Sequence, residues 1–384
     1  MNFEYSQEQI TLQDSLKKYL EKNYTFSKHQ ILSESCEAFS PEAWQFYAEI
    51  GLLGIAFEEQ YGGLEGSNAD QILIMETLGR FLCLEPYLST VILCGTLINL
   101  TASHAQKTQW IPNISDGSLK LSLAHFEPDA RYNAHRVSVR ATLDGDSHES
   151  QYILNGHKNV VLNGHAANAF LVSARTQGAD HEAHGISLFW IQANTPGLIL
   201  SPYRTQDGSM ACDLEFKNLT VQASHMIGQP GSALSAITQA LEHANAALCA
   251  EALGIMTVIN ELTLDYLKTR QQFGKNIGSF QALQHRMVDM LGQEQQSRSM
   301  AILAAQALSL HDSKKRARDV SAAKAFICKA ARHVGQEAIQ LHGGIGVAHE
   351  YSVAHYFKRL TMITLLLGDY NHHLKQVSDY LIDK

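Results

Sequence analysis

The sequence of 384 residues lacks any Cys-x-x-Cys pair, although it contains six cysteines. They are widely scattered and mostly lie in apolar segments: Cys36, Cys83, Cys94, Cys212, Cys249 and Cys328. Scattered cysteines without a paired spacing are not typical of a disulfide framework. We interpret them as thiols of the protein core in a reducing cytoplasm.

Long apolar runs and long runs of one charge are also missing. The most apolar stretch, residues 81–100, is interrupted by Glu85 and Pro86, and no basic region followed by an apolar run opens the chain. We therefore expect no export signal, no membrane span and a cytoplasmic location. The formal net charge of -8 argues against binding to nucleic acid or to anionic membranes.

A metal-binding pattern is absent as well, despite 19 histidines. His181 and His184 lie in a glycine-bounded loop, where we expect solvated side chains, and no second ligand pair follows at a zinc spacing. A di-iron bundle needs a Glu-x-x-His on each of two helices, and the region without proline contains none. We predict that the protein has no metal site.

Proline is missing from the last third of the chain, because all seven prolines precede residue 231. An interior proline disrupts a helix, so this region suits long helices. Its apolar residues recur at spacings of three and four, in two groups: Ala252, Ile255, Ile259, Leu262 and Tyr266, and then Phe280, Leu283, Met287 and Met290. We predict a helix bundle in which these stripes form the core and not a ligand channel.

The first part of the chain is also predicted to be helical. Ser6 followed by Gln9 is typical of a capping box, and Ser40-Pro41-Glu42 combines an N-cap, a proline at the first helical position and an acid in the first turn. These signals predict helix starts after Ser6 and after Ser40.

The period of the apolar residues changes to two in the middle of the chain. Apolar and polar residues alternate over 136–143, and residues 186–191 and 214–216 indicate further short strands. Asp144-Gly145 and Asn155-Gly156 are turn signals. The pattern predicts helices, then a β module of about a hundred residues, then helices again.

Two stretches of the last third place hydrogen-bond donors and bare backbone beside a helix: residues 270–281 (RQQFGKNIGSFQ) and residues 340–346 (QLHGGIG). Arg270 offers a planar fork for phosphate oxygens, Gln281 and Gln340 add neutral hydrogen bonds, and Gly343 and Gly344 let a ligand approach the backbone. A Gly-Gly pair alone is more often a helix cap. Together the two stretches indicate a phosphate-bearing cofactor.

With these two motifs the chain resembles the acyl-CoA dehydrogenase family, which has Arg-x-x-Phe-Gly and Gln-x-x-Gly-Gly-x-Gly segments at matching places. The match extends from residue 3 to the end, through residues 58–63 and 76–80. In that family these elements hold the FAD of a neighbouring subunit. The resemblance therefore implies an oligomer and the following FAD-binding residues: Arg270, Phe273, Gln281, Gln340, Gly343 and Gly344.

The resemblance also implies an α+β fold in three parts. These are an N-terminal helical domain (1–118), a middle β-barrel or sandwich domain (119–229) and a C-terminal four-helix bundle (230–384). The implied activity, part of lipid metabolism, is α,β-desaturation of an acyl-CoA thioester, in which a carboxylate removes the α-proton and flavin N5 takes the β-hydrogen as hydride. Electron-transfer flavoprotein is the implied acceptor.

Three segments, residues 266–274, 340–346 and 355–363, look like the small subunit of pimeloyl-CoA dehydrogenase. That subfamily is similar to the paired subunits that oxidise steroid and bile-acid side chains as CoA thioesters. The resemblance points towards dicarboxylic or ring-derived acyl chains.

The catalytic base of the family has no counterpart at either usual position. One glutamate position falls on Leu367 and the other on Ala244, followed by Asn245 where the family commonly has arginine. The titratable residues nearby are Glu242, His243 and Asp369. Asp369 and Glu242 are the remaining candidates for a base. Each also has an ordinary explanation: Asp369 as a helix cap, and Glu242 as a solvated residue on a helix.

The segments beside the flavin ring differ too. The Thr-Glu-Pro-Gly segment of the family becomes Phe126-Glu-Pro-Asp129, Val160 replaces the stacking tryptophan and Leu162 replaces a ring-bonding threonine. Two hypotheses follow. Either this chain completes the FAD site of a second, glutamate-bearing subunit, or it catalyses with a differently placed acid and a rearranged ring pocket. A non-enzymatic adaptor would leave the cofactor-facing motifs unexplained.

Overall fold

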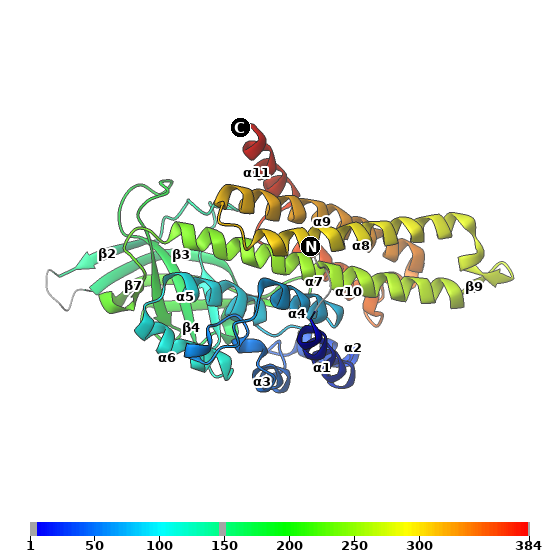
Figure 1. The fold of residues 1–384 in the computed structure, drawn as a ribbon, viewed down its shortest axis with the longest axis horizontal. Coiled ribbons are helices and arrows are strands. Elements are labelled where there is room, and N and C mark those ends of the chain that lie inside the picture. The colour runs from blue at the N-terminus through cyan, green and yellow to red at the C-terminus, as the bar shows by residue number, and fades with distance from the viewer. Residues whose placement is uncertain (1–5, 146–150, 383–384) are drawn as a thin grey trace. The chain divides into compact units, whose positions relative to one another are not determined.

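The computed structural model describes residues 6–145 and 151–382 of the chain (Figure 1). Contacts divide it into two compact units. Unit 1 contains the residues up to Ile31, Asn68–Cys83 and those from Asn245 onward, and unit 2 contains Leu32–Ser67 and Leu84–Ala244. The long helix α7 (Leu234–Thr269) begins in unit 2 and continues through unit 1.

Helices make up unit 1. Besides α7 these are α1 (Gln7–Asn23), α2 (Phe26–Glu34, ending in unit 2), α4 (Asn68–Arg80), α8 (Gln281–Ala307), α9 (Ser313–His342), α10 (Ser352–Ile363) and α11 (Tyr370–Ile382). A short hairpin of β9 (Gln271–Gln272) and β10 (Lys275–Asn276) joins α7 to α8. The predicted long helices without proline are confirmed.

Unit 2 combines helices with an eight-stranded sheet. Its helices are α3 (Pro41–Glu49), a π-helix (Leu88–Cys94), α5 (Gly95–Thr101) and α6 (His104–Ser115). Its strands are β1 (Leu121–Ala124), β2 (Arg140–Asp144), β3 (Gln151–Leu162), β4 (Ala169–Arg175), β5 (Ile186–Gln192), β6 (Leu198–Arg204), β7 (Met210–Gln222) and β8 (Met226–Ile227). The sheet order is β6-β7-β3-β2-β4-β5-β8, with β1 parallel to β4.

The predicted helix starts are confirmed. Ser6 and Gln9 form a reciprocal capping box, and the Ser40 side chain accepts a hydrogen bond from the backbone of Ala43 at the start of α3. Together with the helix, sheet, helix order, this confirms the α+β architecture.

Two details of the β module differ from the prediction. Asn155-Gly156 is not a turn but lies inside β3, where the register to β7 shifts and Gly156 adopts φ 133°. A Cβ on Gly156 would lie 2.9 Å from the Val139 side chain, so only glycine fits at this position of the strand. The alternation over residues 136–143 gives a strand only from Arg140 onward, because the backbone N–H groups before it bind a buried carboxylate.

That carboxylate belongs to Glu127 and forms the centre of a buried polar network in unit 2. It accepts hydrogen bonds from the backbone of Ser138 at 2.8 Å and of Val139 at 3.1 Å, and from the Ser138 hydroxyl. Lys158, which is fully buried, donates to Glu127 at 2.6 Å, to the His125 carbonyl at 2.9 Å and to Ser173 at 3.0 Å. All three ammonium protons of Lys158 therefore have an acceptor.

The network sets the charge state of each member. Burial would raise the pKa of Glu127, but the Lys158 ammonium and the hydrogen bonds outweigh it and lower that pKa. Burial lowers the pKa of Lys158 to about 8, against the opposing effect of Glu127. Burial and the Lys158 charge also lower the pKa of His125 to about 3, so its ring is neutral. At neutral pH, Glu127 and Lys158 form a charged pair.

A close helix crossing organises unit 1. A Cβ on Gly79 of α4 would lie 2.3 Å from the Glu251 carbonyl, and one on Gly254 of α7 would lie 2.0 Å from the Glu76 carbonyl. The two glycines thus bring the helix backbones into direct contact. By length and composition α7 could cross a membrane, but most of its apolar window is buried inside the protein.

We predict that Glu127→Gln lowers the free energy of unfolding by about 3–5 kcal/mol, because it leaves the Lys158 ammonium buried without its counter-charge. Urea titration followed by circular dichroism measures this. Glu215→Gln, which removes a half-buried partner of the exposed Lys217 at 3.1 Å, should cost no more than about 1 kcal/mol.

The same pair fixes a pH dependence. The pKa of Glu127 in the folded protein lies below its ordinary value of 4.5. The pair therefore stabilises the folded state fully above pH 4.5, and this stabilisation is lost as the pH falls through the folded pKa. An acid titration in which wild type and Glu127→Gln lose the same stability would contradict this assignment.

Candidate functional site

The two motifs predicted to bind a cofactor lie at the same end of unit 1. The ring of Tyr266, near the end of α7, stacks on His342 at the end of α9, with the centroids 4.6 Å apart. His342 also contacts Tyr351 at 5.2 Å. These contacts hold the end of α7, from which Arg270 follows, beside the end of α9, from which Gly343 follows.

Arg270 begins the hairpin that extends from this end. Its carbonyl accepts from the Ile277 backbone at 2.9 Å, and Asn276 donates to the Lys268 carbonyl at 2.7 Å. At the tip, Phe273 and Gly274 both have positive φ, 53° and 78°. A phenylalanine in this conformation is strained, and its side chain is 89% exposed. Strain and an exposed aromatic ring at one position indicate a binding surface.

The glycine pair has two different roles. Gly343 caps α9 with φ 63° and ψ -142°, and its N–H bonds back to the last turn of the helix, so the ordinary explanation as a C-cap holds for this residue. Gly344 needs no positive φ, and nothing lies within 4 Å of a Cβ built on either glycine. The backbone of both residues is therefore open to a ligand.

The donors around this open backbone suit a pyrophosphate. Arg270, Gln281 and Gln340 are exposed, and within the described part of the chain their side chains make no hydrogen bond or ion pair. A guanidinium fork, two amides and accessible N–H groups match the oxygens of a diphosphate. The residues present therefore fit the cofactor that the sequence indicates.

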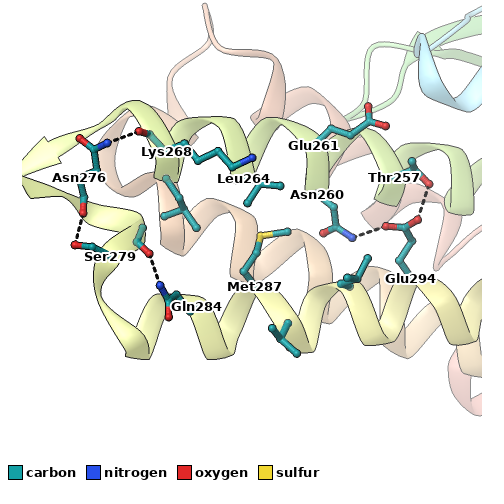
Figure 2. Close-up of a pocket in the computed structure, with 14 residues that line it drawn as sticks. Thr257, Asn260, Glu261, Leu264, Lys268, Asn276, Ser279, Gln284, Met287 and Glu294 are labelled. Atoms are coloured by element: carbon teal, nitrogen blue, oxygen red, sulfur yellow. Dashed lines mark hydrogen bonds between the residues drawn. The ribbon is translucent and has the colours of Figure 1, made fainter.

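A groove adjoins the base of the hairpin. It holds about 760 Å³ between the last turns of α7 and the first turns of α8. Figure 2 shows Leu264 and Met287 in its middle and polar side chains at both ends. At one end Glu294 accepts hydrogen bonds from Thr257 at 3.1 Å and Asn260 at 2.7 Å.

The groove partly corrects the prediction for the apolar stripes. Ala252, Ile255 and Ile259 are buried in the core as predicted, but Met287 lines the groove. The stripe on α8 is only half-buried there, because the groove separates α7 from α8 at this end.

The turn between α10 and α11 contains Leu367, the residue at the first base position. Three side chains from other helices contact backbone carbonyls of this turn. Cys328 contacts the Thr364 carbonyl at 3.8 Å, the fully buried Lys324 donates to the Leu366 carbonyl at 3.2 Å, and Asn245 donates to the Leu367 carbonyl at 3.3 Å. Burial lowers the pKa of Lys324. The turn is thus fixed from both α7 and α9.

Leu367 itself is half-buried with φ 58°, followed by Gly368 with φ 127°. Leucine gains nothing from a left-handed conformation, so the surrounding bonds impose it. The turn keeps a backbone with positive φ at Leu367, although the leucine side chain cannot accept a proton.

The other candidates for a base have different environments. Asp369 accepts from the His372 backbone at 2.8 Å, which confirms its role as a cap of α11. The interpretation of Glu242 as a solvated residue is wrong, because it is only 7% exposed. The first turns of α7 are embedded in the fold, which the local sequence does not reveal. Ala244, at the second base position, is fully buried.

Val160, in unit 2, is another residue with a strained backbone. Val160 has φ 54°, lies at a register shift between β3 and β7, and is 47% exposed. Its N–H donates to Asp213 at 3.1 Å. A β-branched residue with positive φ is an outlier that tertiary contacts must impose. It lies two residues after Lys158, whose network fixes this part of the strand.

No group of three His, Cys, Asp or Glu residues that could hold a metal ion occurs in the described parts of the chain. His181 and His184 are exposed, as expected. All six cysteines are free, and four of them are buried: Cys94, Cys212, Cys249 and Cys328.

Comparisons with known proteins match almost the whole length of the chain. Three family models match consecutive parts of the chain: the N-terminal domain of acyl-CoA dehydrogenase over residues 6–118, its middle domain over 122–219 and its C-terminal domain over 232–382. The short-chain specific acyl-CoA dehydrogenase of Megasphaera elsdenii is 30% identical over 320 residues, 80% of this chain and 81% of that protein.

Two solved structures extend the similarity to the whole fold. "PigA with FAD and proline" is 26% identical, has a TM-score of 0.89 and covers 99% of both chains. A variant of the steroid ACAD Tcur3481-Tcur3483 is 26% identical, has a TM-score of 0.87 and covers 98% of both chains.

The chain belongs to the acyl-CoA dehydrogenase family, the FAD-dependent oxidoreductases that act on CH–CH bonds. The predicted family, fold, enzyme class and cofactor are thereby confirmed. The similarity to the small subunit of pimeloyl-CoA dehydrogenase stays a prediction.

We predict that Gly343→Ala lowers the free energy of unfolding by about 1–3 kcal/mol, because the backbone of Gly343 lies in a region that side chains avoid. Gly344→Ala is the matched control and should change it by less than about 0.5 kcal/mol, since its Cβ meets open space. Urea unfolding of both variants provides the measurement, and equal losses would show that the cap explanation is wrong.

Proposed function

We propose that this chain is a subunit of a heteromeric, FAD-dependent acyl-CoA dehydrogenase. In this proposal its Arg270 end completes the FAD site of a neighbouring subunit, and a second, glutamate-bearing chain removes the α-proton. The observation that carries the proposal is Leu367, a residue that cannot accept a proton in a turn that three side chains hold in place.

The cofactor contacts follow from the donor set. Arg270, Gln281 and Gln340 would hold the pyrophosphate of FAD, Gly343 and Gly344 would let it approach the backbone, and Phe273 would offer it an apolar contact. Bound FAD would accept the β-hydrogen of the substrate as hydride. The contribution of this chain is then binding and orientation, because both of its family base positions carry apolar residues.

The assembly and the substrate are part of the same proposal. The steroid ACAD Tcur3481-Tcur3483, which is 26% identical to this chain, supports a pair of unlike subunits and a ring-derived substrate. We propose dicarboxylic or ring-derived acyl-CoA as the substrate class, electron-transfer flavoprotein as the acceptor, and a cytoplasmic location. We also propose domains at 1–118, 119–229 and 230–384, which the matched family segments support.

One observation favours a second candidate function, a self-sufficient dehydrogenase. Glu242 is a buried glutamate two residues before Ala244, and buried glutamates are found among catalytic bases. Asp369 is less suited, since one of its oxygens already caps α11. This alternative requires the lone chain to bleach its flavin with acyl-CoA and to lose that ability in Glu242→Gln or Asp369→Asn.

We predict that Arg270→Ala weakens FAD retention more than about tenfold, because a hydrogen bond to a charged group contributes roughly 1.5–3 kcal/mol. FAD dissociation from the assembled protein, followed by flavin fluorescence, measures the effect. Arg332→Ala is the control, since Arg332 is also exposed but lies within α9. Unchanged FAD affinity in Arg270→Ala would exclude the assigned role.

We predict that Leu367→Glu gives the lone chain, supplied with FAD, a gain of about 10²- to 10⁴-fold in acyl-CoA-dependent flavin bleaching, the usual contribution of a general base. Leu365→Glu is the control, because Leu365 lies in the same turn but is 49% exposed. Stopped-flow absorbance of both variants tests this. Fast bleaching by the unaltered lone chain that Glu242→Gln or Asp369→Asn abolishes would overturn the heteromer proposal.

A further inference from the structure

A fully buried lysine of α9, Lys324, lies behind the turn of Leu367 with few hydrogen bonds. Within the described residues its side chain has one acceptor, the Leu366 carbonyl at 3.2 Å. Lys158, which is equally buried, has three. A buried ammonium that leaves two N–H groups without an acceptor is costly, so this position favours the neutral amine.

The charged neighbours of Lys324 do not hold it in the protonated form. Glu251 favours the ammonium, but Arg359 opposes it and binds that carboxylate at 2.5 Å and 2.8 Å. Burial is the main cause that lowers the pKa of Lys324. A neutral amine can act as a base and as a nucleophile, whereas an ammonium can do neither. Neither FAD binding nor the proposed reaction uses this capacity.

The thiols of two cysteines lie in the electrostatic range of this lysine. Cys328 follows Lys324 by four residues on α9, which puts both side chains on one face of the helix. Cys249 belongs to α7. Burial raises the pKa of both thiols, that of Cys249 to about 12, and Lys324 opposes this rise at each of them. The lysine is thus the neighbour that favours a thiolate at either cysteine.

Cys328 is better placed than Cys249 to react with the amine. Its thiol contacts the Thr364 carbonyl at 3.8 Å, and Lys324 binds the carbonyl two residues further along the same turn. Nitrogen and sulfur therefore lie against one short piece of backbone. Of the four buried cysteines, Cys328 is 4% exposed, whereas the other three are fully enclosed.

We propose that Lys324 and Cys328 form a redox-controlled crosslink, a sulfenamide bond between Nζ and Sγ, with hydrogen peroxide as the oxidant. A flavoprotein is exposed to this oxidant, because dioxygen gives hydrogen peroxide when it oxidises a reduced flavin. Peroxide is nearly as small as water and can enter sites that are closed to larger reagents. The proposal goes beyond the heteromer and does not depend on which subunit carries the base.

The reaction has two steps. In the first, the Lys324 amine takes the thiol proton of Cys328 and the thiolate attacks one peroxide oxygen. The O–O bond breaks, the sulfur is oxidised to a sulfenic acid, and the departing hydroxide takes the proton from the ammonium and leaves as water. In the second, the neutral amine attacks the sulfur, so that an S–N bond forms and the S–O bond breaks. The hydroxide leaves with one amine proton as a second water.

The crosslink changes the turn of Leu367. It draws Nζ of Lys324 towards Cys328 and away from the Leu366 carbonyl, which then loses a donor in a buried place. Peroxide thereby loosens the backbone that this donor holds. A thiol reductant cleaves the S–N bond and restores the amine and the thiol, so the change is reversible.

The test is a tryptic digest of the full-length chain with bound FAD, after treatment with hydrogen peroxide and alkylation of free thiols without reductant. Trypsin cuts after an unmodified lysine, so the untreated protein gives peptides 319–324 and 325–329. The crosslink prevents the cut after Lys324 and gives one unalkylated peptide, 319–329, that lacks two hydrogen atoms. Dithiothreitol should restore both shorter peptides.

Two variants locate the bond. The uncut peptide should be lost in Cys328→Ala and kept in Cys249→Ala, which is the matched control because Cys249 is also buried and also affected by Lys324. Circular dichroism checks that each variant folds, and fragment ions of the wild-type peptide identify the bonded residues without either variant. Cys36 is exposed, so its oxidation shows that the peroxide has acted.

Three results would overturn the proposal. These are a complete cut after Lys324 in protein whose Cys36 is fully oxidised, a disulfide between Cys249 and Cys328, and oxidation of Cys328 that stops at the sulfenic or sulfinic acid.

Discussion

Unit 1 depends on the backbone contact between α4 and α7 at Gly79 and Gly254. Because the helices touch there, carboxylates on both can reach cations on the neighbouring helices. Glu76 binds Arg298 of α8 at 3.0 Å and Glu251 binds Arg359 of α10 at 2.5 Å. These pairs fix α7 relative to α4, α8 and α10. The fixed α7 then supplies Asn245 to the turn of Leu367 and ends where the Arg270 hairpin begins.

Part of this could be predicted from the sequence. The missing prolines and the spacing of the apolar residues predict the long helices, and Ser6 and Ser40 predict two helix starts. The turn prediction at Asn155-Gly156 fails because a glycine is also needed where another segment, here Val139, approaches a strand closely, and local sequence does not distinguish the two cases. The helical spacing of Met287 likewise does not reveal whether a neighbouring helix covers it.

The sequence predicts which residue types form the candidate site, but it does not predict which of them have a strained backbone. Arg270, Gln281 and Gln340 are visible as donors beside glycine. Positive φ at Phe273, Val160 and Leu367 is not visible, since none of these residue types favours it. At two of these residues contacts from distant parts of the chain impose it: Asp213 at Val160, and Asn245 at Leu367, with Lys324 at the neighbouring Leu366 carbonyl.

These strained residues bear on how the chain departs from its family. If the turn at Leu367 had no remaining role, its bonds to Lys324 and Asn245 could relax and leucine could return to an ordinary conformation at a gain of about 1–3 kcal/mol. The turn instead keeps three donors on its carbonyls and a buried lysine that serves one of them. A backbone held in this way continues to shape whatever binds beside it. In the proposed heteromer, this turn would therefore transfer no proton but would keep its positioning role, because another chain supplies the base.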